Sequence, residues 1–196
     1  MSEIHSSAHQ EGRYDRHELI SSWDQKRLTS ASILVAGAGA LGNETLKLMA
    51  LLGAGHLQVI DYDLVSTSNL SRMVLFRQAD IGRPKAEVAA ERLREINPEI
   101  EVQTIQGDLR YDIGLGAFRK ADIVLGCLDS VNSRWALNRN CMQAGVPWLD
   151  AGISDFHGQV AYFNPVRGAC YECTFTETTH ERFGRRYSCP YGLLSR

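Results

Sequence analysis

Short apolar runs alternate along this chain with segments whose apolar residues recur at helical spacing. Four runs have the length and composition of buried strands: residues 33–36, 57–60, 121–128 and 146–149. Helical spacing marks the segments between them, at residues 41–52, 85–96 and 131–144. Strands that alternate with helices form a parallel sheet covered on both faces. The pattern therefore predicts an α/β fold with a doubly wound, mainly parallel, Rossmann-like sheet.

The first long helix is expected to bury one stripe of its surface. That stripe consists of Leu41, Thr45, Leu48, Met49 and Leu52. A segment without sustained periodicity, residues 64–84, follows the second strand. Because long ordered loops in compact domains often carry function, we expect this segment to border the functional site.

Both ends of the chain differ from this pattern. Residues 1–12 are polar and aperiodic, and we expect them to be disordered. Residues 14–28 predict one amphipathic helix packed against the rest of the chain. Residues 153–164 have strand character and leave no room for a crossover helix, which predicts an antiparallel C-terminal extension of the sheet. Residues 13–196 are expected to form a single domain.

A glycine-rich turn with the spacing GxGxxG follows the first strand. Gly37 permits the tight turn, Gly39 lets a phosphate approach the backbone, and Gly42 lets the next helix pack on the strand. Asp61 stands at the end of the second strand, about 20 residues further on, where a carboxylate binds ribose hydroxyls. Strand, turn, helix, strand and acid in this order predict a nucleotide site.

Charged residues are expected to surround this site. Asp61 and Asp129 both follow strands, and the carboxyl ends of parallel strands share one crevice. The candidate cations are Arg72, Lys85 and either Arg13 or Arg16. Cationic clamps with a carboxylate for Mg²⁺ suit a nucleoside triphosphate better than a dinucleotide.

Composition restricts the partners. The chain has 196 residues, 44% hydrophobic and 22% charged, as in an ordinary globular protein. Lys and Arg number 21 against 23 Asp and Glu, so no field of one sign favours nucleic acid or an anionic membrane. The apolar runs are strand-sized, and the N-terminus lacks the apolar core of a signal peptide. We therefore expect a cytoplasmic protein that binds neither nucleic acid nor membrane.

In such a compartment the five cysteines are expected to be thiols or metal ligands. Cys170 and Cys173 have the CxxC spacing of half a zinc site, which Cys189 and His180 would complete. The same spacing also suits a redox pair or two ordinary thiols. Cys189 follows a basic run at residues 182–186, and both a structural and a nucleophilic role are open for it.

Seven motifs then occur in a fixed order: residues 13–19, 37–42, 61–72, 82–87, 96–102, 127–134 and 170–173. Their combination resembles the E1-like ThiF/MoeB/HesA adenylyltransferases, and it covers nearly all of the chain from Arg13 onward. The bacterial activators of sulfur-carrier proteins in molybdopterin and thiamine synthesis look most similar.

The resemblance implies an activity and a partner. Such enzymes use ATP and Mg²⁺ to adenylate the C-terminal glycine carboxylate of a small ubiquitin-like carrier protein that ends in Gly-Gly, and they release pyrophosphate. By this resemblance the turn at Gly39 and Ala40 would lie against the nucleotide, and Asp61 would bind the ribose.

The resemblance also implies roles for the remaining site residues. The phosphates would be held by Ser68, Asn69, Arg72 and Lys85. Asp129 with Ser130 would serve the Mg²⁺ and the edge of the nucleotide. Arg13 would reach the phosphates of the neighbouring subunit, which implies a homodimer.

The chain also departs from the family. Ala40 stands where members often have a second glycine. The second CxxC of the family's zinc site is absent, so we expect a truncated or unusually short C-terminal part. Cys189 falls near the family's crossover cysteine. Two other functions are carried as alternatives: a non-catalytic module that binds a ubiquitin-like protein, and an NAD-dependent oxidoreductase, which would leave Arg72, Lys85 and Asp129 without a role.

Overall fold

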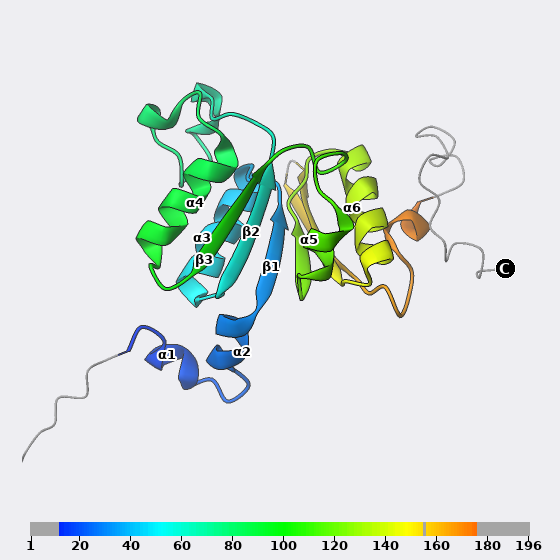
Figure 1. Ribbon diagram of the computed structural model, residues 1–196, viewed down its shortest axis with the longest axis horizontal. Coiled ribbons are helices and arrows are strands. Elements are labelled where there is room, and N and C mark those ends of the chain that lie inside the picture. Colours follow the sequence, from blue (N-terminus) through cyan, green and yellow to red (C-terminus); the bar gives the residue numbers. More distant parts are fainter. Residues whose placement is uncertain (1–11, 155, 176–196) are drawn as a thin grey trace, which may run out of the picture.

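Six strands form one sheet in the order β3-β2-β1-β4-β5-β6, and the computed structural model describes residues 12–154 and 156–175 (Figure 1). Strands β1 to β5 are parallel, and β6 is antiparallel to β5. The strand bounds are Ser32–Ala36, His56–Asp61, Glu101–Gln106, Ile123–Gly126, Trp148–Ser154 and His157–Phe163. The predicted doubly wound sheet with an antiparallel extension is confirmed.

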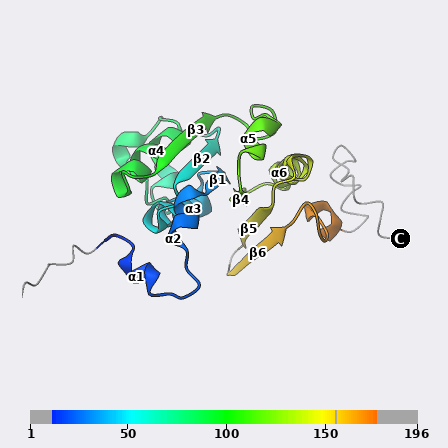
Figure 2. The same ribbon diagram turned by 60° about the horizontal axis from the view of Figure 1, so that its bottom comes forward.

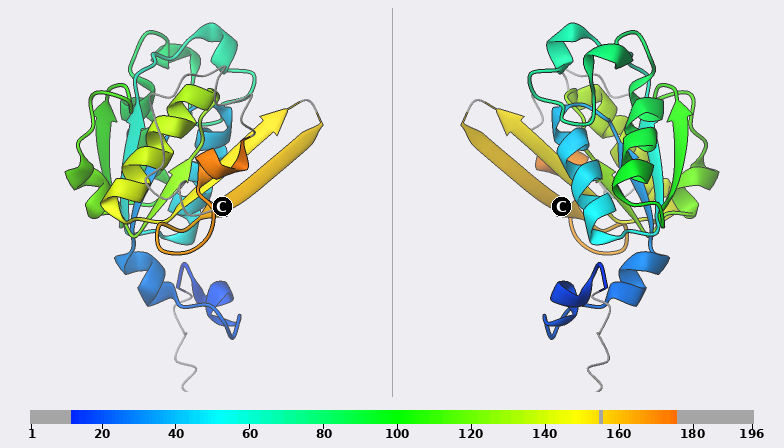
Figure 3. Two further views of the ribbon diagram at one scale, coloured as in Figure 1. Left: turned by 90° about the vertical axis from the view of Figure 1, so that its right-hand side faces the viewer. Right: turned by 90° about the vertical axis from the view of Figure 1, so that its left-hand side faces the viewer.

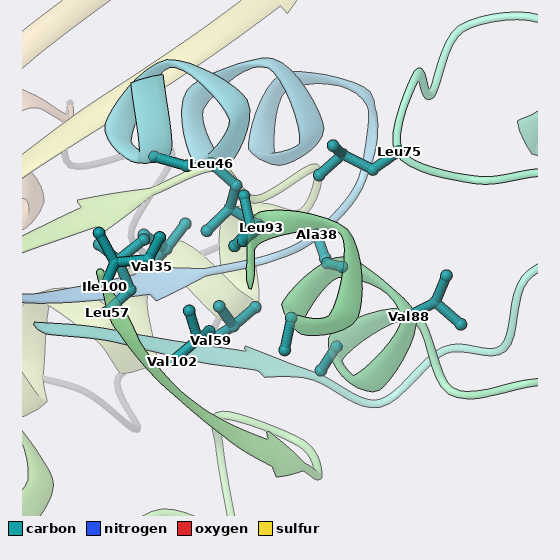
Figure 4. Packing of buried hydrophobic residues seen from close by; sticks show 14 of the residues in the cluster. Val35, Ala38, Leu46, Leu57, Val59, Leu75, Val88, Leu93, Ile100 and Val102 are labelled. Carbon is teal, nitrogen blue, oxygen red and sulfur yellow. The ribbon is translucent and has the colours of Figure 1, made fainter. Parts of the chain in front are cut away.

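Helices cover both faces of the sheet (Figures 2 and 3). Helices α3 (Ala40–Leu52) and α4 (Lys85–Ile96) pack on one face of β1, β2 and β3, where Leu46 and Leu93 meet the buried face of the strands at Val35 and Val59 (Figure 4). Helices α5 (Leu115–Arg119) and α6 (Val131–Ala144) cover the other face, over β4 and β5. Among the described residues, no helix has both the length and the apolar character needed to cross a membrane.

The buried stripe of α3 differs from the predicted one. Gly42, Asn43, Leu46 and Ala50 are buried, whereas Leu48 is 49% exposed. The reason is steric, because a Cβ at Gly42 would lie 1.9 Å from the carbonyl oxygen of Gly37. The side of the helix that carries Gly42 must therefore face β1, and the predicted stripe is about one residue out of phase.

The N-terminal segment forms two short helices instead of one. Helix α1 spans Asp15–Glu18 and α2 spans Gln25–Ser30, and neither buries a residue. Asp24 caps α2 by accepting a hydrogen bond from the backbone N–H of Arg27 at 3.0 Å. This cap starts a new helix in the middle of the predicted one. The predicted disorder of residues 1–12 concerns residues that lie outside the described part of the chain, with the exception of Gly12.

The long connection after β2 is ordered. It contains two 3₁₀ turns, η1 (Thr67–Asn69) and η2 (Gln78–Asp80), and buries Val65, Met73 and Phe76. Helix α5 was not predicted, because five residues are too few to show helical periodicity. A third 3₁₀ turn, η3 (Tyr171–Thr174), packs against α6 near the end of the described chain.

Candidate active site

A crevice of about 580 Å³ opens at the carboxyl ends of β1, β2 and β4. Asp61, Asp129, Arg72 and Lys85 all line it. The structure thus brings together two acids and two cations that the sequence placed in separate segments. This is the position at which doubly wound sheets bind ligands.

The glycine-rich turn forms one wall of the crevice. Gly37 has a positive φ of 95°, and a Cβ there would lie 2.6 Å from the carbonyl oxygen of Cys127. A Cβ at Gly39, by contrast, would meet nothing within 4 Å. Asn43 on α3 anchors the turn by donating to the Ala38 carbonyl at 3.2 Å and accepting from the Leu75 N–H at 2.7 Å. The backbone at Gly39 is therefore open toward a ligand on a rigid support.

Asp61 links the glycine-rich turn to the end of β2 through hydrogen bonds. Its carboxylate accepts hydrogen bonds from the N–H groups of Ala38 at 2.7 Å and Asp63 at 2.8 Å. Burial raises the pKa of Asp61, and the two backbone hydrogen bonds with the nearby charge of Lys85 act in the opposite direction. The carboxylate is therefore fixed in orientation at the place expected for a ribose-binding acid.

Lys85 begins α4 and points into the crevice. Its Nζ lies 2.7 Å from Oδ2 of Asp63, and its side chain is only 8% exposed. Its backbone N–H also donates to the carbonyl of Asp63 at 3.0 Å. Asp63 is a site residue that was not predicted, although it lies two residues after Asp61 in the same motif.

Arg72 and Asn69 enter from the loop after β2. Asn69 Oδ1 accepts from the backbone N–H of Ser66 at 2.9 Å, which closes η1, and Arg72 Nη1 donates to the carbonyl of Ser68 at 2.7 Å. Asn69 and Arg72 line the crevice, but Ser68 does not, and its hydroxyl lies 3.0 Å from that of Ser66. Ser68 thus contributes through its carbonyl, which holds Arg72.

Asp129 and Ser130 join β4 to α6. Asp129 lines the crevice, whereas Ser130 caps α6, where its hydroxyl accepts from the Ser133 N–H at 3.1 Å and donates to the Ser133 hydroxyl at 2.8 Å. Ser133 lines the crevice in its place. The cap holds the first turn of α6 directly behind Asp129.

Arg134 is a further residue that lines the crevice and was not predicted to do so. It donates to the carbonyl of Leu128 at 2.7 Å and to Oδ1 of Asp150 at 3.0 Å, and Asp150 is 1% exposed. Burial raises the pKa of Asp150, and the charge of Arg134 opposes this. Because Leu128 precedes Asp129, Arg134 helps to fix the backbone next to Asp129, where β4 joins α6. The signal was its place in the motif at residues 127–134.

Arg13 and Arg16 do not lie at the crevice of their own chain. Arg13 Nη1 donates to the carbonyl of Ile96, the last residue of α4, while Lys85 at the first residue of α4 lines the crevice. The two positions are eleven residues apart along the helix, which corresponds to roughly 17 Å. Helix α1 accordingly lies at the opposite end of the sheet (Figure 1). The expectation that one of these arginines surrounds the crevice of the same chain is wrong.

The CxxC pair lies away from the crevice, at η3. The two sulfur atoms of Cys170 and Cys173 are 3.5 Å apart, with Cys170 buried and Cys173 exposed. Within residues 12–154 and 156–175, no three His, Cys, Asp or Glu side chains are grouped as a metal site. Cys189 and His180 lie outside the described residues.

The fold and the crevice define a doubly wound α/β domain with acids and cations at the carboxyl ends of its strands. The chain belongs to the ThiF family, because the model of that family matches residues 14–191.

Several curated proteins are similar in sequence. The mouse adenylyltransferase and sulfurtransferase MOCS3 is 37% identical over 83% of this chain and 36% of its own length. The sulfur carrier protein adenylyltransferase of Thermus thermophilus is 36% identical over 77% of this chain and 58% of its own. The Escherichia coli sulfur carrier protein ThiS adenylyltransferase is 33% identical over 84% of this chain and 67% of its own length. The chain thus spans only part of the first two proteins.

Solved structures of E. coli MccB are similar in fold. The crystal structure of MccB with ATP has a TM-score of 0.75 and 28% identity, covering 90% of this chain and 55% of that one. The structure with AMPCPP and selenomethionine MccA has a TM-score of 0.74 at 28% identity, covering 89% and 55%.

Proposed function

We propose that this chain catalyses ATP-dependent adenylation of the C-terminal glycine carboxylate of a small ubiquitin-like carrier protein, with release of pyrophosphate. One observation carries the proposal: Asp61, Arg72, Lys85 and Asp129 line a single crevice beside the glycine-rich turn. Two comparisons also support the proposal: several relatives are adenylyltransferases, and the similar MccB structure was solved with ATP.

The crevice fits the nucleoside part of ATP. The open backbone at Gly39 and the start of α3 at Ala40 give the nucleotide a glycine-rich wall at a helix N-terminus, which favours an anion. Asp61 is held by two backbone hydrogen bonds at the end of β2, where its carboxylate would accept from the ribose hydroxyls. In this arrangement the phosphates point toward the loop after β2.

The charged side chains suit the phosphates. Arg72, held by the Ser68 carbonyl, and Lys85 would neutralise their charge, and Asn69 would donate a hydrogen bond. Asp129, at the end of the loop capped by Ser130, would hold Mg²⁺. Mg²⁺ held at Asp129 would supply positive charge that stabilises the leaving pyrophosphate, in addition to the charge of Arg72 and Lys85.

The proposed reaction does not require a general base from the protein. A C-terminal carboxylate has an ordinary pKa of about 3.5, so it is ionised near neutral pH and needs no general base. Its oxygen attacks the α-phosphorus, the bond to pyrophosphate breaks, and an acyl-adenylate forms. Catalysis by this chain then consists of aligning the carboxylate with the phosphate and neutralising the leaving group with Arg72 and Lys85.

The proposal includes a homodimer in which Arg13 serves the partner's phosphates. Its support is the place of Arg13, on the carbonyl of Ile96 and far from the crevice of its own chain. The exposed Leu19 and Ile20, which are 76% and 51% exposed beside α1, add apolar surface that a second copy would cover. We also place the protein in the cytoplasm.

Zinc at Cys170 and Cys173 is proposed as a structural site. The 3.5 Å between the sulfur atoms suits two ligands of one ion, and two further ligands would come from beyond the described residues. Cys189 is proposed either as one of these ligands or as the thiol that takes the activated carrier. Metal content of the wild-type protein and of Cys173→Ser distinguishes zinc binding from a pair of ordinary thiols.

The decisive experiment is ATP–pyrophosphate exchange by the purified chain with Mg²⁺, with and without small carriers that end in Gly-Gly. We expect carrier-dependent exchange that falls at least about 100-fold in Asp129→Ala and is retained in Asp24→Ala, a change far from the crevice. ATP binding without exchange by any carrier would favour the non-catalytic binding module. Binding of NADH in place of ATP would overturn the proposal.

A further inference from the structure

A buried asparagine joins the two walls of the crevice. Asn43 lies in the first turn of α3 and is 0% exposed. Its Nδ2 donates to the carbonyl of Ala38 in the glycine-rich turn at 3.2 Å, and its Oδ1 accepts from the backbone N–H of Leu75 at 2.7 Å. Leu75 belongs to the loop after β2, and both partners lie in the buried cluster of Figure 4. One side chain thus binds the turn at one end and the loop at the other.

Packing alone would favour an apolar residue at position 43. The other buried residues of α3 are Gly42, Leu46 and Ala50, and burying an amide without partners costs free energy. The Asn43 amide is satisfied, because one end faces a carbonyl and the other faces an N–H. An aspartate would lack the donor, and a leucine would lack both groups. The chemistry of the position therefore fits a link between two backbone segments.

Each partner of Asn43 is connected to a residue of the site. The N–H of Ala38 donates to Oδ2 of Asp61 at 2.7 Å, so the turn is also bonded to the ribose-binding candidate. Leu75 follows Arg72 by three residues, and Arg72 lines the crevice. Asn43 therefore stands between the nucleoside side of the crevice and its phosphate side.

The loop after β2 has two further supports. Its ends close at a neck, where the N–H of Val65 donates to the carbonyl of Arg83 at 2.8 Å. Asp80 holds its later part to α4 by accepting from an arginine of that helix at 3.3 Å. The bond to Asn43 attaches the middle of the loop to α3, and of the three supports it is the nearest in sequence to Arg72.

We propose that Asn43 is a positioning residue, which holds the loop at a fixed distance from the glycine-rich turn and so sets Arg72 against the phosphates. This inference rests on the proposed function. Asn43 does not line the crevice, so it acts through the backbone of Ala38 and Leu75. Asp61 keeps its own hydrogen bonds without it. The loss of Asn43 should therefore disturb charge neutralisation in the transition state more than ATP binding.

The first test compares two buried asparagines. Asn138 on α6 is 1% exposed, and its Oδ1 accepts from the backbone N–H of Tyr171 at 3.1 Å, outside the crevice. Asn43→Ala and Asn138→Ala should both unfold at a lower urea concentration than the wild type, because each leaves a buried backbone group without its partner.

The two variants should differ in activity. At a temperature where circular dichroism shows both to be folded, Asn43→Ala should lower kcat for ATP–pyrophosphate exchange about tenfold, with the dissociation constant of ATP within about threefold. Asn138→Ala should leave both quantities within about twofold of the wild type. Unchanged kcat in Asn43→Ala, an equal loss in both variants, or a loss confined to ATP affinity overturns the proposal.

A double-variant cycle tests whether Asn43 acts through Arg72. Asn43→Ala should lower kcat about tenfold when Arg72 is present and less than about twofold in the Arg72→Met background. A merely structural role would give the same loss in both backgrounds, and that result would contradict the proposal.

The wild-type chain tests the link even if Asn43→Ala does not fold. The N–H of Leu75 lies in a loop, yet its bond to a buried side chain should slow its hydrogen–deuterium exchange. Nuclear magnetic resonance should show exchange at least about tenfold slower for Leu75 than for its neighbour Val74, which is 60% exposed. Equal rates at the two positions would remove the link.

The readouts separate this inference from the proposed function. Pyrophosphate exchange by the wild type that Asn43→Ala leaves unchanged would keep the adenylation and remove the role of Asn43. No pyrophosphate exchange by the wild type with any carrier would remove the adenylation, and the positioning role with it.

Discussion

Lys85 donates two hydrogen bonds to Asp63, one from its Nζ to Oδ2 at 2.7 Å and one from its backbone N–H to the carbonyl oxygen at 3.0 Å. The two contacts join the first residue of α4 to the chain just beyond β2. The side chain of Lys85 is 8% exposed, while that of Asp63 is 48% exposed. The cation is thus fixed at the crevice before any phosphate arrives, and a phosphate would share it with Asp63.

This arrangement predicts that Lys85→Met lowers kcat/KM for ATP–pyrophosphate exchange at least about 100-fold, because one pre-positioned charge for the leaving group is lost. Lys26→Met on α2 is the matched control, since that lysine is exposed and lies outside the crevice. The two variants should have similar free energies of unfolding, because Asp63 remains hydrated when its partner is removed. Exchange by Lys85→Met within about threefold of wild type would contradict the role of Lys85.

Two glycines of one turn should respond differently to alanine. Gly42→Ala places a Cβ 1.9 Å from the Gly37 carbonyl oxygen, so α3 must move away from β1, and we expect a loss of about 2 kcal/mol or more in the free energy of unfolding. Gly39→Ala meets nothing within 4 Å and should leave stability within about 0.5 kcal/mol.

The added methyl at Gly39 would nevertheless occupy space where the backbone is proposed to meet the nucleotide. Gly39→Ala should therefore weaken ATP binding about tenfold, as measured by calorimetry, without a change in urea-induced unfolding. Unchanged ATP affinity in this stable variant would place the nucleotide elsewhere.

The sequence predicted four of the five parallel strands from their nearly continuous apolar runs. Strand β3 has no such run, because only Val102 of its six residues is buried. The sequence also predicted that Asp61 and Asp129 share a crevice, since topology alone places strand ends together. It failed for the face of α3, because hydrophobicity pointed to the leucines while a steric contact at Gly42 decides the orientation.

Other parts of the site depend on contacts that no local pattern contains. Arg134 and Asp150 are 16 residues apart and meet only after α6 packs on β5. Arg13 looked like a crevice cation because the sequence does not show which end of the sheet its helix reaches.

The ion pair of Arg134 and Asp150 should be important for stability. Asp150 is 1% exposed, so Arg134→Met leaves a buried carboxylate without its partner, and we expect a loss of about 3 to 5 kcal/mol in the free energy of unfolding. The double variant Arg134→Met, Asp150→Asn removes the buried charge as well and should be more stable than Arg134→Met alone. Urea unfolding of the wild type and the three variants, with Asp150→Asn included, gives the coupling free energy. Additive effects of the two substitutions would show that the pair is not coupled.

Asp61 should make stability depend on pH in a defined direction. Burial is the largest influence on its pKa and raises it above the ordinary value of 3.8 in the folded protein. Between these two pKa values the folded state keeps the proton that the unfolded state has lost, so stability falls as the pH rises through this window. Asp61→Asn carries no charge at position 61 at any pH, so its free energy of unfolding lacks this decrease.

The free energy of unfolding of Asp61→Asn minus that of the wild type should therefore increase between about pH 4 and pH 7. The altered hydrogen bonds to Ala38 and Asp63 add only a constant to this difference. Urea unfolding across this range measures the difference, and a value that stays flat or decreases with pH would show that burial does not dominate the ionisation of Asp61.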